Sequence, residues 1–399
     1  MTEQRLARKI GLPLLVLYGL GTILGAGIYV LIGEVALSAG ALAPLSFLVA
    51  AIIAWVTAMS YSQLVVLFPR SAGEAVYVEK GFSLHWLSAL VGLLIILTGV
   101  VSAATLSNGF IGYLNLFITV PNNLGMIVVL VFLCALAAWG ISESLAAAAV
   151  LTLIEVVGLL IVVVFCGDAL LVSPAKIGGL FVPTSFAAFT GVLSGAFIAF
   201  YAFIGFEDMV NVVEEVKEPS KIMPKAILLV IVVSTFLYVL VALIAILSLP
   251  LAQLSASDAP LALMLESRSK TASKLIGGSS VFAILNGVLI QIIMASRVLY
   301  GIAYKKYIPQ VFGRVHPKTK TPIYATIAIS ILVVLFALWF PLVTLAKITS
   351  FVILVIFTLV NLALWRVSLQ SEYENKITQR QYPRIGALLC VLLLISQLL

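Results

Sequence analysis

Two runs of this chain put glycine and polar residues in the middle of apolar helices of membrane length. They are Gly19–Val30 (GLGTILGAGIYV) and Phe200–Glu215 (FYAFIGFEDMVNVVEE). An unpaired backbone amide or carbonyl costs several kcal/mol in hydrocarbon, so a helix is interrupted at that depth only where protein or a cavity satisfies the freed groups. The sequence therefore predicts two broken helices that share a cavity.

The composition places the rest of the chain in the membrane as well. Of its 399 residues 63% are hydrophobic and 10% are charged, and the mean hydropathy is +1.22, whereas soluble domains average about 25% charged residues. We therefore expect an all-α polytopic membrane protein without a soluble domain. Runs long enough to cross about 30 Å of hydrocarbon predict eleven spans, near Leu12–Leu37, Ala43–Phe68, His85–Tyr113, Leu124–Gly140, Ala147–Leu171, Ala187–Val216, Ile227–Leu249, Leu275–Tyr304, Ile323–Phe340, Val343–Trp365 and Ile385–Leu399.

The distribution of basic residues predicts the orientation. Most of the 23 lysines and arginines lie in loops on the side of the amino terminus, and the opposite loops carry only Lys176, Arg268, Lys270 and Lys274. Because short cytoplasmic loops are enriched in Lys and Arg, we expect a cytoplasmic amino terminus and a place in the cell (inner or plasma) membrane. The net charge of +7 is dispersed over these loops, so it does not indicate a nucleic-acid partner.

The predicted spans divide into two sets of five helices. The sets cover residues 11–171 and 187–366, and the segment 382–399 adds one further helix. An odd number of helices per set makes the second set enter from the opposite face, so the predicted pseudo-symmetry is inverted. Residues 1–399 are expected to form one transmembrane domain.

The first interruption is Gly25-Ala26-Gly27. If the helix unwinds there, the free amides at the start of the next half-helix carry about half a positive charge and suit a carboxylate. Close helix packing is the alternative explanation, because Gly21 and Gly25 form a GxxxG pair.

The second interruption, Tyr201–Gly205, ends a half-helix whose carbonyl groups attract an ammonium group. Amides for a carboxylate and carbonyls for an ammonium fit the backbone of an α-amino acid. Tyr201 and Phe203 are then expected to form walls or a gate of the site, with ordinary packing as the alternative.

Three carboxylates are predicted at or near membrane depth. Glu155 lies inside the fifth span, and Glu207 and Asp208 follow the second interruption. An intramembrane carboxylate costs roughly 2.5–3.5 kcal/mol on insertion scales and suggests a functional site by default. Glu155 is expected to carry a proton or to bind a cation, and Glu207 to act in gating or coupling. A structural carboxyl bonded to a neighbouring helix is the alternative, and Asp208 is expected nearer the cytoplasm.

Four motifs resemble the amino acid–polyamine–organocation (APC) permeases. They are LYGLGTILGAGIYVLIG, FPRSAGEAVYVEKGF, YAFIGFEDMVNVVEEVKEPSKIMPKAI and NGVLIQIIMASRVLYGIAYKKYIPQVF. The resemblance covers about Gly11 to Trp365 and implies the LeuT-like fold, an inverted repeat of five plus five helices with helices 1 and 6 broken. It makes Gly25–Gly27 a carboxylate loop, Tyr201 an aromatic gate, and Ile204 and Gly205 the break in span six. Glu207 matches an acidic gating position.

Two features depart from the family pattern. Glu155 falls where several proton-coupled relatives have a lysine whose ammonium fills the place of a sodium ion, and a carboxylate cannot imitate a cation. The eleventh span also lacks the usual twelfth partner, which leaves open both a homo-oligomer and a complex with a small accessory subunit.

The predicted function is secondary active transport, with proton-coupled uptake of neutral α-amino acids by alternating access. Amino acid exchange, transport of cationic amino acids or polyamines, and sodium coupling are the alternatives, and a non-transporting amino acid sensor is a more distant one. No metal-ligand motif or nucleophile elbow indicates an enzyme.

The expected partners are an amino acid and the lipid bilayer, and no cofactor or metal is expected besides the coupling proton, with sodium as the alternative ion. The candidate substrate-binding residues are Ile23, Gly25, Ala26, Gly27, Tyr201, Phe203, Ile204 and Gly205, and the candidate coupling or gating residues are Glu155, Tyr201 and Glu207.

Overall fold

Helices make up the structure, as the apolar runs predict. The computed structural model describes residues 8, 10–69, 73–139, 145–171, 174–304, 308–317, 319, 321–373 and 381–398. Its α-helices are α1 (Leu12–Leu24), α2 (Ala26–Ala39), α3 (Ala43–Leu67), α4 (Gly73–Phe82), α5 (His85–Leu114), α6 (Asn122–Trp139), α7 (Leu145–Cys166), α8 (Pro174–Gly179), α9 (Phe186–Phe200), α10 (Pro219–Ser248), α11 (Leu251–Ser255), α12 (Pro260–Glu266), α13 (Lys270–Tyr304), α14 (Ile323–Trp339), α15 (Leu342–Val367) and α16 (Tyr382–Ile395). The 3-10 helices are η1 (Gly40–Leu42), η2 (Gly167–Leu170), η3 (Tyr201–Phe203), η4 (Phe206–Glu215), η5 (Gln310–Gly313) and η6 (Ser396–Leu398).

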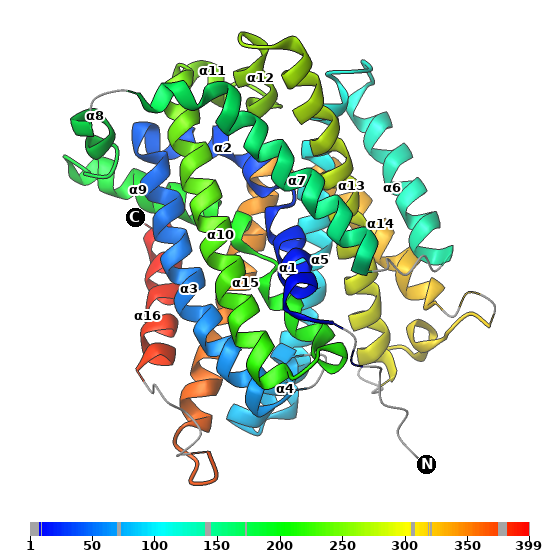
Figure 1. The fold of residues 1–399 in the computed structure, drawn as a ribbon. Helices are drawn as coiled ribbons and strands as arrows, with labels where there is room; N and C mark the ends of the chain where they lie inside the picture. The colour runs from blue at the N-terminus through cyan, green and yellow to red at the C-terminus, as the bar shows by residue number, and fades with distance from the viewer. Residues whose placement is uncertain are drawn as a thin grey trace.

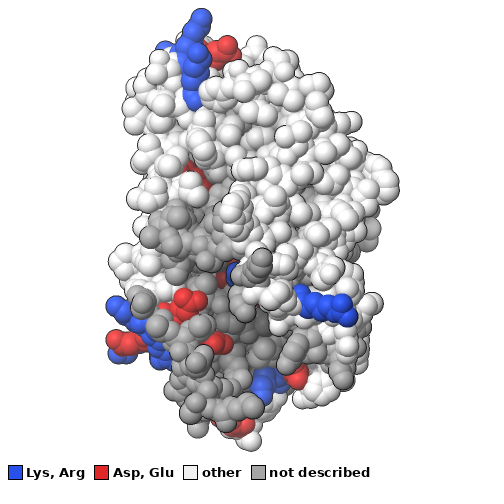
Figure 2. Space-filling view, turned by 90° about the vertical axis from the view of Figure 1, so that its right-hand side faces the viewer, with Lys and Arg blue, Asp and Glu red and all other residues white. Residues whose placement is uncertain are grey.

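The described helices confirm an all-α polytopic membrane protein. Eight stretches are long and apolar enough to cross a membrane, and the shorter apolar helices are Leu12–Leu24, Ile323–Trp339 and Tyr382–Leu398. One of the eight, Gly27–Leu67, joins α2 to α3 through the three residues of η1, so two of the predicted spans are nearly continuous. On the face shown in Figure 2, charged residues gather toward the two ends and leave most of the surface between them uncharged.

The orientation of the bundle stays a prediction. Part of the basic residues that predict a cytoplasmic amino terminus lie outside the described residues, namely Arg5, Lys9, Arg70, Lys305, Lys306, Lys318, Lys320, Lys376 and Arg380.

The interrupted helices lie inside the bundle. In Figure 1 α1 lies at the centre, α11 and α12 lie at one end, and α4 lies at the other. Helix α1 packs against α7 and α10, α5 packs against α13 and α15, and α3 packs against α9 and α10. These neighbours hold the interruptions away from lipid.

The two broken spans run antiparallel to each other. Helix α2 packs against α9, and the segment before α1 pairs with the segment after η4 in an isolated parallel bridge between Ile10 and Val216. The Ile10 amide donates to the Glu215 carbonyl at 3.0 Å, and the Lys217 amide donates to the Ile10 carbonyl at 2.9 Å. Each half of one broken span thus lies beside the opposite half of the other.

A polar network links α3, α15 and α16 inside the bundle. The Ser60 hydroxyl donates to the Asn361 side-chain oxygen at 2.6 Å, and the Asn361 amide donates to the Thr57 hydroxyl at 3.1 Å. Gly386 of α16 lies directly against Asn361. Because a polar side chain at membrane depth needs a partner, this network fixes how the three helices face one another.

Short helix α4 docks closely on α15. A Cβ added at Gly81 would lie 2.5 Å from the Ala363 Cα and 2.7 Å from its Cβ, so the two backbones are nearly in contact. Only a residue without a side chain permits this approach, and it holds α4 beside the interior of the bundle.

We expect Gly81→Ala to destabilise the protein by about 1–3 kcal/mol, because the added methyl group must push α4 from α15. The matched control is Gly301→Ala, also within a helix, where an added Cβ meets nothing within 4 Å; there alanine gains up to about 1 kcal/mol of helix propensity. Thermal unfolding in detergent measures both. Equal melting temperatures of the two variants would contradict the packing argument.

Candidate functional site

The first interruption is at Gly25, as the sequence predicts. Helix α1 ends at Leu24, Gly25 takes φ −9° and ψ −143°, and α2 begins at Ala26. A Cβ added at Gly27 would lie 2.6 Å from the Ala202 Cα, so α2 starts directly against η3. The first amides of α2 therefore lie beside the second interruption.

The second interruption is at Ile204 and Gly205. Helix α9 continues into η3, Ile204 is extended with φ −69° and ψ 136°, and Gly205 has φ +128° before η4 begins. L side chains rarely adopt that positive φ. A Cβ at Gly205 would also lie 2.6 Å from the Thr22 carbonyl carbon, so both the dihedral angle and the space require glycine.

Two side chains join the interruptions through backbone carbonyls. The Thr22 hydroxyl lies within hydrogen-bond distance of the Gly205 carbonyl, at 3.0 Å. The Tyr238 hydroxyl of α10 lies 2.7 Å from the Ile23 carbonyl and 2.9 Å from the Ala202 carbonyl, and its ring packs edge-on against Phe203. Tyr238 was not among the sequence candidates; the signal that marks it is a tyrosine in the middle of the predicted span Ile227–Leu249.

A small cavity lies between the two interruptions. Its volume is about 40 Å³, which holds at most a few water molecules, so an amino acid enters only if the surrounding helices move apart. Backbone, apolar and polar side chains all line it: Gly21, Thr22, Ile23, Gly25, Gly27, Ser102, Leu106, Tyr201, Ile204, Asp208, Gly287, Ile290 and Gln291.

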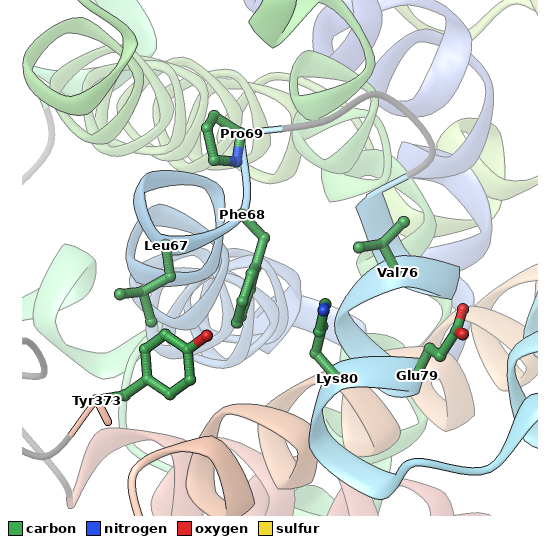
Figure 3. A pocket seen from close by; sticks show the side chains of 7 residues that line it. All are labelled: Leu67, Phe68, Pro69, Val76, Glu79, Lys80 and Tyr373. Carbon is green, nitrogen blue, oxygen red and sulfur yellow. The ribbon is translucent and has the colours of Figure 1, made fainter. Parts of the chain in front are cut away.

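A larger cavity of about 680 Å³ lies at one end of the bundle, between the end of α3, α4 and Tyr373. Figure 3 shows the Lys80 side chain directed toward its interior, on the side of the Phe68 ring, with Tyr373 beyond that ring. The Lys80 ammonium lies 5.9 Å from the centre of the Phe68 ring. Neither helix interruption borders this cavity, so we place the candidate site in the small one.

The structure brings most of the predicted substrate-binding residues to the small cavity. Ile23, Gly25, Gly27, Tyr201 and Ile204 line it. The Tyr201 hydroxyl lies 3.0 Å from the Ser102 hydroxyl of α5, which fixes the aromatic wall. The others are placed differently: Gly205 packs on Thr22, Phe203 packs on Tyr238, and Ala26 begins α2 with its side chain outside the described part.

The two carboxylates predicted to act in coupling lie near the interruptions but do not line the cavity. Glu155 of α7 is 1% exposed, and its backbone carbonyl accepts a hydrogen bond from the Tyr29 hydroxyl of α2 at 2.9 Å. The Glu207 carboxylate accepts a hydrogen bond from the Gly205 amide at 2.9 Å, so it turns back and caps its own interruption.

Asp208 lines the cavity in place of Glu207. Its side chain is 8% exposed, and among the described residues it is the one charged side chain that lines the small cavity. The sequence prediction puts Asp208 nearer the cytoplasm and leaves it out of the candidate site residues. The 3-10 winding of η4 turns each residue by about 120° instead of about 100°, which changes the direction of each side chain.

Glu74 of α4 is a further buried carboxyl near the second interruption that the sequence candidates did not include. The Tyr61 hydroxyl of α3 donates to it at 3.3 Å. Burial raises the pKa of the Glu74 carboxyl to about 7; hydrogen bonds from its own amide and from Tyr61 oppose the rise, and the neighbouring Asp208 carboxylate adds to it.

The raised pKa of Glu74 predicts a pH dependence of stability. Between its ordinary pKa near 4.5 and its folded value near 7, the folded protein holds a proton that the unfolded chain releases, so the free energy of unfolding falls as the pH rises through this window. We expect the melting temperature to fall between about pH 5 and about pH 8. The free energy of unfolding should fall by at most about 3 kcal/mol over the same range. Glu74→Gln should flatten this dependence in detergent melts; an unchanged slope would contradict it.

Comparisons with known proteins identify the family of the chain. A family model described as amino acid permease matches residues 10–399. The branched-chain amino acid permease BcaP of Bacillus subtilis is 30% identical over 384 residues, which cover 90% of this chain and 81% of that protein.

The cationic amino acid transporter 4, vacuolar, of Arabidopsis thaliana is 27% identical over 383 residues. The match covers 89% of this chain but 62% of the plant protein, so the chain spans less than two thirds of that relative. With a family match over nearly its whole length and interrupted helices around a cavity in a membrane-spanning bundle, the chain belongs to the amino acid permease family.

Proposed function

We propose that the protein carries neutral α-amino acids across the plasma membrane by alternating access, in symport with protons. The observation that carries the proposal is the meeting of two broken helices at one cavity inside the bundle. Such a pair supplies both charges that an amino acid backbone requires.

The two ends of the substrate backbone have separate binding groups. The amides at the start of α2, around Gly25 and Gly27, suit the carboxylate, because a helix amino end attracts negative charge. The carbonyl ends of α1 and η3 suit the ammonium group. This assignment also makes Gly25–Gly27 the carboxylate loop, with Tyr201 as the wall above the substrate.

The remaining wall favours an apolar side chain. Leu106, Ile204 and Ile290 line the cavity, and one relative is named a branched-chain amino acid permease. A cationic substrate is the second candidate, because other relatives are named cationic amino acid transporters and Asp208 faces the same cavity.

Glu155 is proposed as the group that couples transport to protons. It is buried on α7, which packs directly against the broken helix α1. A carboxyl at that place that gains a proton on one side of the membrane and loses it on the other biases the direction of transport. Glu207, bonded to the amide of the second interruption, is proposed as a gating residue.

Transport is tested by uptake of labelled leucine, lysine and arginine into proteoliposomes that contain the purified protein. We expect leucine to accumulate when the outside is made acidic, and accumulation to persist when choline replaces sodium at fixed pH. Absent uptake across a full amino acid panel would refute transport, and a loss of uptake without sodium would refute proton symport. Exchange that requires preloaded lysine would favour the cationic alternative.

Glu155→Gln keeps the size of the side chain but cannot release a proton. We expect it to abolish accumulation driven by a pH gradient while leucine binding and exchange remain, because only the coupling step requires titration. The control is Glu266→Gln, an exposed residue at the end of α12. Retained pH-driven accumulation in the Glu155 variant would make the residue structural.

A further inference from the structure

Three properties of Asp208 bear on ligand binding. It lies at the start of η4, directly after the interruption at Gly205, and its amide donates to the Gly205 carbonyl at 3.1 Å. Its side chain is more than nine-tenths buried. It also lines the cavity between the two interruptions.

The Asp208 carboxylate has no partner among the described residues. The hydrogen bonds and ion pairs of the described part leave it without a donor or a cation, whereas Glu207 is bonded to the Gly205 amide and Glu74 to the Tyr61 hydroxyl. The ion pairs present, such as Arg268 with Asp168, lie elsewhere. Asp208 is therefore the one carboxylate of this group whose oxygens are available to a ligand.

A buried carboxylate without a cation is costly, and a cationic ligand offsets that cost. The described residues that line the cavity with it supply no cation, because they offer backbone, hydroxyl, amide and apolar groups. The neighbouring carboxyls of Glu74 and Glu207 add only like charge. A cation that pairs with Asp208 at this site therefore comes from the ligand.

The lining of the cavity indicates which cationic group this is. Gly25 and Gly27, at the amino end of α2, line the same cavity as Asp208. A ligand that enters when the surrounding helices move apart therefore meets the helix end and the carboxylate in one site. The α-carboxylate and the α-ammonium of an amino acid are adjacent charges of this kind.

We infer that the Asp208 carboxylate binds the α-ammonium group of the transported amino acid. This inference rests on the proposed function and adds to it an ionic partner for the ammonium besides the backbone carbonyls. Asp208 then recognises the amine of the substrate, whereas the Glu207 carboxylate binds the backbone amide of Gly205.

The test compares leucine with its hydroxy acid analogue, which keeps the carboxylate and the side chain but has a hydroxyl group in place of the ammonium. Each compound competes with labelled leucine for uptake by the wild type and by Asp208→Asn. We expect the KM for leucine to rise about 10- to 100-fold in the variant, because one charge-assisted hydrogen bond is lost. The inhibition constant of the hydroxy acid should change less than about threefold, so discrimination between the two compounds collapses.

Glu266→Gln is the matched control, because it removes an exposed carboxylate at the end of α12 that does not line the cavity. It should keep the wild-type ratio of hydroxy acid to leucine affinity. If Asp208→Asn fails to transport, equilibrium binding of both compounds to the purified variant gives the same ratio.

Two outcomes would overturn the inference while the proposed function stands. One is a ratio unchanged in Asp208→Asn. The other is a loss confined to lysine and arginine with leucine affinity intact, which would assign Asp208 to a substrate side chain. Failure of the proposed function is recognised separately, as absence of amino acid uptake and binding in the wild type.

Discussion

The requirement that every backbone group in hydrocarbon find a partner governs this structure. Two helices are interrupted at Gly25 and Gly205, and hydroxyl groups of neighbouring residues serve part of the backbone released there. The Thr22 hydroxyl lies within hydrogen-bond distance of the Gly205 carbonyl, and the single Tyr238 hydroxyl lies between carbonyls of both broken spans. The two interruptions therefore lie together, and the cavity is found where they meet.

Glycine decides how closely the breaks approach. Gly27 lies against Ala202 and Gly205 against Thr22, at distances that no Cβ would allow. Gly27 also lines the cavity, whereas Gly205 does not. In the GxxxG pair, Gly21 packs against Thr152 of α7, but a Cβ at Gly25 would meet nothing closer than the Gly21 carbonyl oxygen at 3.9 Å. Close packing therefore explains Gly21 but not Gly25, where the helix is interrupted.

The sequence was sufficient for features that depend on local composition. The spans follow from hydropathy, and the breaks follow from glycine at membrane depth. It was not sufficient for features that depend on side-chain direction or on contacts between distant segments. Asp208 and Glu207 are adjacent in the chain, yet the 3-10 winding of η4 turns one into the cavity and the other back to Gly205. The role of Tyr238 depends on where α10 crosses both breaks, and no local pattern encodes that crossing.

The bridge between Ile10 and Val216 has a mechanical consequence. It fastens the beginning of the first broken span to the end of the second by two backbone hydrogen bonds. A hinge motion at Gly25 or Gly205 therefore either moves the two bridged segments together or breaks the bridge. Breaking it costs about 1 kcal/mol for each hydrogen bond. The motions of α1 and η4 are therefore coupled at this end of the molecule. At the other end, α2 and α9 are coupled through their packing contact.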